Sequence, residues 1–276
     1  MFFDLEVVSP RIKRIKMPYV CAYYLEGDQA GLLIDTGWGY GNLKTFVDQL
    51  ANKPYQVVLS HGHCDHGGGA NQFDQVYLAE ADLELEEYSC SLPVRQKIFS
   101  QVVSDERNVF DASIWQAQRQ APFRTLYPGQ VFDLGGLTVT VEALPGHTLG
   151  SMAFWLEQEQ TLITCDACAQ TTYLNLPSSA SVYELWASGR ELQVKYPNMG
   201  QILTSHPPYS GPGQMLGAMV ELADKILHDQ DDRLLLKMRM EGQSYAAINK
   251  KLSPEPPMAN IVYSMNKVKE SIEQVS

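Results

Sequence analysis

Four side chains that can bind a metal ion lie within six residues of this chain. His61, His63, Asp65 and His66 form the pattern H-x-H-x-D-H, which contains three of the six histidines in the sequence. Imidazole and carboxylate groups are the ligands that hold zinc and its first-row neighbours in proteins. The spacing therefore predicts a metal-binding loop, and a polar turn with solvated histidines is the alternative.

The residues before this pattern read as a buried strand. Residues 55–60 are apolar and rich in β-branched side chains, and three glycines follow the pattern at 67–69. The cluster is therefore expected on the loop that leaves a strand, where successive side chains can point in different directions. His61 and His63 could reach one ion while Asp65 and His66 reach a second, so this loop could begin a two-metal site.

Strand and helix patterns alternate along the chain, which predicts α/β layering. The apolar and β-branched runs indicate strands at 4–8, 11–16, 19–25, 30–35, 55–60, 76–78, 130–134, 137–144, 151–156, 161–165 and 201–205. Helical spacing of apolar residues indicates helices at 42–50, 80–88, 182–196 and 215–227.

Further metal-binding side chains follow other predicted strands. Asp166 and His206 come directly after the runs that end at residues 165 and 205, and His147 follows the run that ends at residue 144 after one Pro-Gly pair. His228 alone falls outside this arrangement, at the end of an amphipathic helix, where a solvated or capping role is expected. Asp35 ends a strand and precedes a helix, which is compatible with an Asx turn or a helix N-cap.

Five short signatures together carry a family resemblance. They are residues 34–37 (IDTG), the H-x-H-x-D-H pattern, 145–151 (PGHTLGS), 164–167 (TCDA) and 204–206 (TSH). In this order they resemble the metallo-β-lactamase-fold hydrolase superfamily, in its glyoxalase II and lactonase-like branch, over about residues 1–230. The resemblance implies an α+β fold, an αββα sandwich of two mixed β-sheets flanked by helices.

The resemblance also implies a set of metal ligands. One metal would take His61, His63 and His147, and the second would take Asp65, His66 and His206. Asp166 would bridge the two ions, and Asp35 would support the loop from behind the ligands. Lactam-cleaving members generally lack an aspartate ligand at the position of Asp166, so a penicillin substrate is disfavoured.

A pair of divalent ions would supply the nucleophile. Two ions about 3.5 to 4 Å apart lower the pKa of a shared water towards about 7, so no serine or cysteine nucleophile is needed. We expect zinc, with manganese or iron as alternatives of matching ligand type. Asp65 and Asp166 are candidates for proton transfer, and Tyr173 and Tyr209 are candidate substrate contacts because they follow ligand positions.

The leading functional hypothesis is a dinuclear hydrolase that cleaves an ester, thioester or lactone bond of a small molecule. Phosphodiester or RNA cleavage on the same metals is an alternative. A di-iron oxidoreductase is another, although its motif characteristically has glutamate where this chain has His63. A non-catalytic metal module would predict a missing ligand, and none is missing.

One segment interrupts the series of signatures. Residues 91–123 carry mixed helical signals, with Val94, Ile98, Val102 and Val103 on one possible face and Phe110, Ile114 and Trp115 beyond it. In the resembling family this region commonly forms a variable cap near the active site, so we expect substrate selection there. An ordinary surface helix pair is the alternative.

The C-terminal part carries no recognisable chemistry. We expect a catalytic domain over residues 1–230 and a helical tail or lid over 231–276, with two helical segments around 253–257. This tail is also a candidate dimer contact in a homo-oligomer.

Charge and cysteine usage bound the remaining questions. The 276 residues carry a formal net charge of −11, which argues against nucleic acid and anionic membranes as partners. The first residues lack a signal-peptide pattern, and no apolar run reaches the roughly 20 residues that span a bilayer, so we expect a cytoplasmic protein. Five scattered cysteines fit reduced thiols, with a redox role for the pair at 165 and 168 as the alternative.

Overall fold

The computed structural model describes residues 2–103, 112–236, 243–247 and 258–269. The chain forms two compact units. Unit 1 comprises Met1–Val141, Leu156–Gln158 and Ser205–Pro207, and unit 2 comprises Glu142–Trp155, Glu159–Thr204 and Pro208–Ser276. Each unit is described separately.

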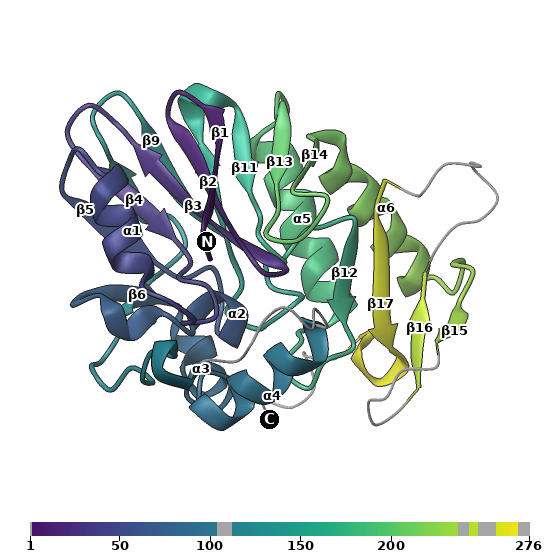
Figure 1. The fold of residues 1–276 in the computed structure, drawn as a ribbon. Coiled ribbons are helices and arrows are strands. Elements are labelled where there is room, and N and C mark those ends of the chain that lie inside the picture. The colour runs from purple at the N-terminus through teal and green to yellow at the C-terminus, as the bar shows by residue number, and fades with distance from the viewer. Residues whose placement is uncertain (1, 104–111, 237–242, 248–257, 270–276) are drawn as a thin grey trace. The chain divides into compact units, whose positions relative to one another are not determined.

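Unit 1 contains a mixed seven-stranded sheet whose strands follow the chain order (Figure 1). The strands are β1 (Asp4–Ser9), β2 (Ile12–Met17), β3 (Val20–Glu26), β4 (Gly31–Ile34), β5 (Tyr55–Val58), β6 (Val76–Leu78) and β7 (Arg124–Thr125). Pairing is antiparallel from β1 to β4 and parallel from β4 to β7. Parallel neighbours need crossover connections, and helices supply them in this unit.

The helices of unit 1 lie in these crossovers. They are α1 (Leu43–Leu50), α2 (Cys64–Gly67), α3 (Leu83–Ser89) and α4 (Leu92–Val102), with short 3₁₀ turns at Ala70–Gln72, Glu80–Asp82 and Ala112–Ile114. The Asn42 side chain caps α1 by accepting a hydrogen bond of 2.9 Å from the Thr45 amide. The buried face of α1, with Leu43 and Val47, joins Leu33 and Val57 of the sheet in one hydrophobic core.

The buried face of α4 differs from the predicted one. Of the four predicted residues, Val103 just after the helix is buried, whereas Val94, Ile98 and Val102 are only half-buried. Arg95 and Phe99, one turn apart, are the buried residues of α4. Phe99 contacts an aromatic cluster, and the apolar spacing alone could not identify Arg95 as a core residue because its guanidinium needs tertiary acceptors. Part of the predicted cap, residues 104–111, lies outside the described residues, and its role in substrate selection stays a prediction.

A hairpin follows the large sheet. Strand β8 (Val131–Asp133) pairs antiparallel with β9 (Thr138–Ala143), as the Gly135–Gly136 turn between them predicts. Both glycines have positive φ, 78° and 68°, which explains why this turn uses them. Strand β9 runs across the boundary into unit 2.

Unit 2 contains two groups of strands. In the first, β10 (Met152–Leu156), β11 (Thr161–Ile163), β13 (Gln201–Leu203) and β14 (Ser210–Pro212) follow the order β14-β13-β11-β10. In the second, the order is β12 (Thr171–Leu174), β17 (Asn260–Ser264), β16 (Ser244–Ala246) and β15 (Leu234–Leu236). Strand β12 pairs parallel with β17, and the other two pairs are antiparallel.

The predicted helical tail is wrong for most of the described C-terminal residues. Within 231–236, 243–247 and 258–269 the regular elements are the strands β15, β16 and β17 and one 3₁₀ turn, Met265–Lys267. The runs that form these strands are short, and the pairing of β17 with β12 spans about 90 residues of chain, so local periodicity could not reveal them. The predicted helices around 253–257 lie outside the described residues, and the domain division at residue 230 stays a prediction.

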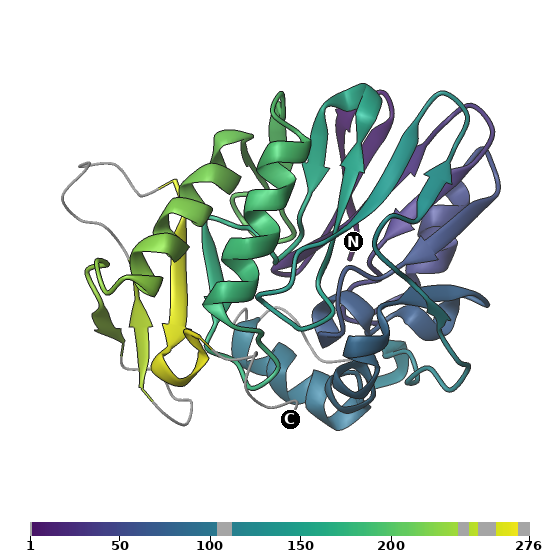
Figure 2. The same ribbon diagram turned by 180° about the vertical axis from the view of Figure 1, so that it is seen from behind.

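Two long helices cover the first strand group within unit 2. Helices α5 (Val182–Lys195) and α6 (Gln214–Leu227) lie side by side (Figure 2). A capping box begins α5, because the Ser181 hydroxyl accepts from the Glu184 amide and the Glu184 carboxylate accepts from the Ser181 amide. Among the described helices, none combines the length and apolar character that a membrane span requires.

Candidate metal centre

The H-x-H-x-D-H pattern lies where the sequence predicts, on the segment that leaves β5. His63 precedes α2, and Asp65 and His66 lie within it. The His61 ring centroid is 4.9 Å from that of His63 and 4.1 Å from that of His66. His61 and His66 are buried, while His63 and Asp65 are half-buried, so the cluster has one sheltered and one accessible side.

Three side chains of unit 1 bring their ligand atoms together. One ligand atom each from Asp65, His66 and His206 lie within 4.8 Å of one another. Asp65 Oδ2 is 3.3 Å from His206 Nε2 and 3.6 Å from His66 Nε2. Two nitrogen or oxygen atoms that bind one tetrahedral zinc at about 2.0 to 2.1 Å lie roughly 3.3 Å apart. The three side chains therefore fit a single ion.

The backbone of unit 1 holds His206 in this position. The Ser205 carbonyl accepts a hydrogen bond of 2.9 Å from the Cys21 amide, and His206 Nδ1 donates to the Tyr19 carbonyl. Tyr19 has a φ of 65°, a left-handed backbone conformation that residues other than glycine rarely adopt. The turn between β2 and β3 thus positions a ligand 187 residues further along the chain.

Asp35 supports the ligand loop through three hydrogen bonds. Its Oδ1 accepts from the Ser60 amide at 2.7 Å, and its Oδ2 accepts from the Ser60 hydroxyl at 2.9 Å and from His66 Nδ1 at 2.8 Å. The Asp35 side chain is buried and its φ is 68°. The N-cap role is wrong, because the Asn42 side chain caps α1 instead.

These contacts select the histidine tautomer that binds metal. Carbonyl and carboxylate oxygens only accept hydrogen bonds, so Nδ1 of His66 and of His206 carries the proton and the lone pair of the neutral ring lies on Nε2. Because the Ser60 hydroxyl donates to Asp35, it accepts from His61 Nδ1 at 2.9 Å, which gives His61 the same tautomer. Metal-binding histidines usually donate their other N–H in this way.

Unit 2 contains the same kind of arrangement around His147. His147 Nδ1 donates to the Tyr173 carbonyl at 2.9 Å, and His147 Nε2 is 3.6 Å from Asp166 Oδ2. The Ser179 hydroxyl donates to the His147 carbonyl at 3.0 Å and fixes the backbone. Here too the proton lies on Nδ1, and the spacing of Nε2 and the carboxylate suits two ligands of one ion.

Tyr173 contributes to this arrangement through its backbone carbonyl. The residue lies on β12, its carbonyl orients His147, and its side chain is 42% exposed. Tyr209 is half-buried, and its carbonyl accepts a hydrogen bond of 3.1 Å from the Thr204 amide. Contact of either side chain with a substrate stays a prediction.

Asp82 supports the ligand loop, and the sequence alone does not identify it. Its buried carboxylate accepts a hydrogen bond of 2.8 Å from the Gly62 amide, between two histidines of the pattern. In the sequence Asp82 belongs to an acidic run, and no local pattern separates it from its exposed neighbours Glu80 and Glu84. Its place beside the loop depends on the β5–β6 pairing.

The cysteines of the region are buried thiols. Burial raises the pKa of Cys64 to about 12 and that of Cys168 to about 12. Cys64 packs in the core of unit 1. Cys165 and Cys168 are both buried and are not joined by a disulfide, and the raised pKa of the Cys168 thiol makes it a poor nucleophile, which disfavours a redox role.

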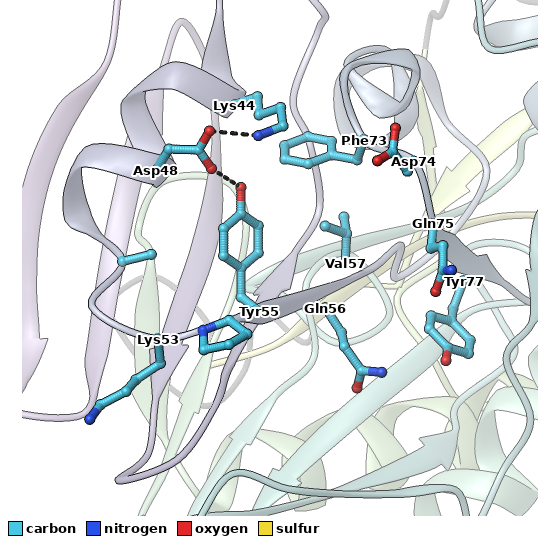
Figure 3. A pocket seen from close by; sticks show the side chains of 12 residues that line it. Lys44, Asp48, Lys53, Tyr55, Gln56, Val57, Phe73, Asp74, Gln75 and Tyr77 are labelled. Carbon is cyan, nitrogen blue, oxygen red and sulfur yellow. Dashed lines mark hydrogen bonds and ion pairs between the residues drawn. The ribbon is translucent and has the colours of Figure 1, made fainter.

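A separate hollow of 560 Å³ lies in unit 1 at the start of β5 (Figure 3). Tyr55 and Phe73 line it together with Lys44 and Asp48. The Asp48 carboxylate accepts from Lys44 Nζ at 2.6 Å and from the Tyr55 hydroxyl at 2.6 Å, so these polar groups satisfy one another. The hollow is at the opposite end of β5 from the histidine pattern and contains none of its ligands.

The chain matches a family model described as Metallo-beta-lactamase superfamily over residues 19–194, more than half of its length. An acyl-coenzyme A thioesterase from Bos taurus is 29% identical over 157 residues, which cover 52% of this chain and 56% of that protein. An atrochrysone carboxyl ACP thioesterase from Aspergillus aculeatus is 27% identical over 175 residues, covering 59% and 46%. The chain spans about half the length of these curated relatives.

Solved structures support the fold. A metallo-beta-lactamase from Pontibacter korlensis has a TM-score of 0.56 at 19% identity, covering 80% of this chain and 99% of that one. The sec-alkylsulfatase Pisa1 from Pseudomonas sp. has a TM-score of 0.64 at 18% identity, covering 82% and 42%. The predicted fold, with mixed sheets and flanking helices, is confirmed.

Proposed function

We propose a function from the premise that this chain belongs to the metallo-beta-lactamase superfamily: it is a metal-dependent hydrolase that cleaves small-molecule thioesters. The histidine and aspartate clusters are typical of the metal site of this superfamily. One observation carries the proposal. Asp65, His66 and His206 converge, and Nδ1 of each ring donates to a carboxylate or a backbone carbonyl, which leaves Nε2 for a metal.

The names of the relatives support a thioester as the bond that is cleaved. Their names describe thioesterases that act on acyl-coenzyme A and on an acyl carrier protein. An ester or lactone, which the sequence allowed equally, has no such support. The carriers named for these relatives are not transferred to this chain, because each aligned region covers only about half of the relative.

We propose a ligand set that joins both groups of side chains. His61, His63 and His147 would hold one ion, Asp65, His66 and His206 would hold the other, and Asp166 would contribute to both. Bound divalent ions, with zinc as the expected metal, supply a Lewis acid and a water of lowered pKa.

The chain's own residues supply orientation and proton transfer. Asp35 and Ser60 hold the imidazoles of His61 and His66 with Nε2 available. Asp65 and Asp166 are the proposed sites through which a proton passes to the departing thiolate. The side chains of Tyr173 and Tyr209 are proposed to contact the acyl group.

The test combines metal content with a substrate panel. The purified chain is assayed for bound metals and for hydrolysis of an acyl-coenzyme A, a simple alkyl thioester, a lactone and a bis-aryl phosphodiester, before and after chelation. Turnover of thioesters that is lost with the metal supports the proposal. Phosphodiester cleavage, iron without hydrolysis, or no metal binding after reconstitution would each overturn it.

A pair of histidine variants sharpens this test. His206→Ala removes a proposed ligand, and His228→Ala removes a partly exposed histidine whose Nδ1 also donates to a carbonyl, that of Asp224 at 2.8 Å. We expect the first variant to lose at least about 100-fold in thioester hydrolysis and the second to retain full activity. A cytoplasmic location and a homo-oligomeric state remain predictions, and the oligomeric state can be tested on the same purified chain.

A further inference from the structure

A buried arginine from α4 contacts the ligand loop of unit 1. Arg95 is 0% exposed, and its Nη1 donates to the Gly68 carbonyl at 2.8 Å and to the Trp38 carbonyl at 3.0 Å. Its Nη2 donates to the Gln116 carbonyl at 2.8 Å. A buried cation costs several kcal/mol in desolvation unless its surroundings compensate, so its retention among carbonyl groups requires a reason.

The two carbonyls that share Nη1 belong to the loops that build the site. Gly68 directly follows α2, which carries Asp65 and His66, and Trp38 belongs to the loop that begins with Asp35. Hydrogen bonds already join these loops nearer the ligands, since the amide and the hydroxyl of Thr36 both donate to the His66 carbonyl, at 2.7 and 2.9 Å. Arg95 joins the same two loops a second time, through the Trp38 and Gly68 carbonyls.

The close approach of these loops depends on glycine. A Cβ atom at Gly68 would lie 2.5 Å from the Trp38 carbonyl oxygen, and one at Gly39 would lie 2.1 Å from the Gly68 carbonyl oxygen. Gly39 also has a φ of 69°. Two carbonyl oxygens that point towards one place repel each other unless a donor lies between them. The forked guanidinium provides that donor and reaches a third carbonyl simultaneously.

We propose that Arg95 is a positioning residue for the metal that Asp65 and His66 bind, an inference that rests on the proposed metal-dependent function. Arg95 fixes the carbonyl end of α2 against the Asp35 loop. The Asp35 carboxylate therefore meets His66 Nδ1, and the Asp65 carboxylate faces the two Nε2 atoms. The segment expected to act as a substrate cap thus contributes to the metal site from behind.

A second buried arginine provides a matched control. Arg119 Nη1 donates to the carbonyls of Ala70 and Phe73 at 3.1 and 2.6 Å, and its Nη2 donates to that of Asp74 at 2.9 Å. These acceptors lie on the turn after the ligand loop. Arg119 is 8% exposed and has the same chemistry as Arg95 without the contact to Gly68. A purely structural role would make the two arginines equivalent.

The experiment compares Arg95→Lys with Arg119→Lys in the full chain. Each apo protein is titrated with Co²⁺ alone, and the visible ligand-field spectrum and the dissociation constants are recorded beside the thermal unfolding curve. We expect both variants to unfold at a lower temperature. Only Arg95→Lys should show an altered spectrum and an affinity about 10- to 100-fold lower for the more weakly bound of the two Co²⁺ ions. Losses of about this size are typical when a residue that orients metal ligands is replaced.

The outcomes separate this inference from the proposed function. A wild-type chain that binds no Co²⁺ overturns both. Wild-type binding with an unchanged affinity and spectrum in Arg95→Lys overturns the positioning role alone. If Arg95→Lys fails to fold, Gly39→Ala supplies the second test, because its added Cβ would lie 2.4 Å from Arg95 Nη1 and 2.1 Å from the Gly68 oxygen. A folded Gly39→Ala chain with wild-type Co²⁺ affinity would equally overturn the inference.

Discussion

Asp35→Asn tests how a buried carboxylate controls the metal site. Asparagine tolerates the left-handed conformation at this position, so the backbone φ of 68° is retained. The wild-type carboxylate accepts three hydrogen bonds, from the Ser60 amide, the Ser60 hydroxyl and His66 Nδ1. The asparagine amide offers one acceptor oxygen and one NH₂ group, so it cannot satisfy all three donors.

Both orientations of the amide carry a cost. If its nitrogen faces His66, the imidazole must move its proton to Nε2, the atom that would bind metal. If its nitrogen faces Ser60, the buried backbone amide loses its acceptor, which costs about 1 to 3 kcal/mol of stability. We therefore expect about 10- to 100-fold weaker binding of one Zn²⁺ or Co²⁺, and a lower unfolding temperature of the apo chain.

The assay is a competition titration of each apo protein against a chelator of known affinity, beside thermal unfolding. Thr36→Val is the matched control, because it removes the hydrogen bond of 2.9 Å from the Thr36 hydroxyl to the His66 carbonyl and leaves the imidazole contact intact. This control should lose stability and keep its metal affinity. Wild-type metal affinity together with a wild-type unfolding temperature in Asp35→Asn would refute the reasoning, because one amide orientation must change the tautomer of His66 and the other must leave the Ser60 amide without its acceptor.

Three further predictions concern stability. Burial raises the pKa of Glu86 to about 7 from a value near 4.5 in the unfolded chain, so the folded state retains a proton that the unfolded state releases. The free energy of unfolding of the apo chain should then fall by up to about 3 kcal/mol as the pH rises from 5 to 8. In Glu86→Gln, urea unfolding should show a weaker dependence of this free energy on pH. The same pH dependence in wild type and variant would contradict the raised pKa of Glu86. Ser181→Ala should cost about 1 kcal/mol in the same assay through loss of the α5 cap, whereas an unaltered unfolding midpoint would show that the capping box contributes nothing. Removal of metal by chelation should lower the unfolding temperature of the wild type and leave that of His206→Ala less affected, and an equal shift in both would argue against His206 as a ligand.

The sequence by itself determined where the chemistry lies along the chain. Apolar β-branched runs are local signals, so the strands ending at Ile34, Val58, Ile163 and Leu203 could be located without a structure. The five signatures, through their resemblance to a known family, then implied that Asp65, His66 and His206 share one ion, and the structure brings their ligand atoms within 4.8 Å of one another.

Tertiary structure alone decided how those side chains are held. The Tyr19 and Tyr173 carbonyls orient His206 and His147 through the backbone, and any residue type presents a carbonyl, so sequence carries no sign of them. Arg95 reads as a surface residue on a mixed helix until its acceptors from three loops are in place.

The C-terminal sheet could not be predicted from the sequence for a related reason. Strands β15 and β16 have three residues each, too few to show a period, and β17 acquires its partner β12 from about 90 residues away. Local patterns record which face of an element is apolar, whereas pairing and hydrogen bonding between distant segments depend on the folded chain as a whole.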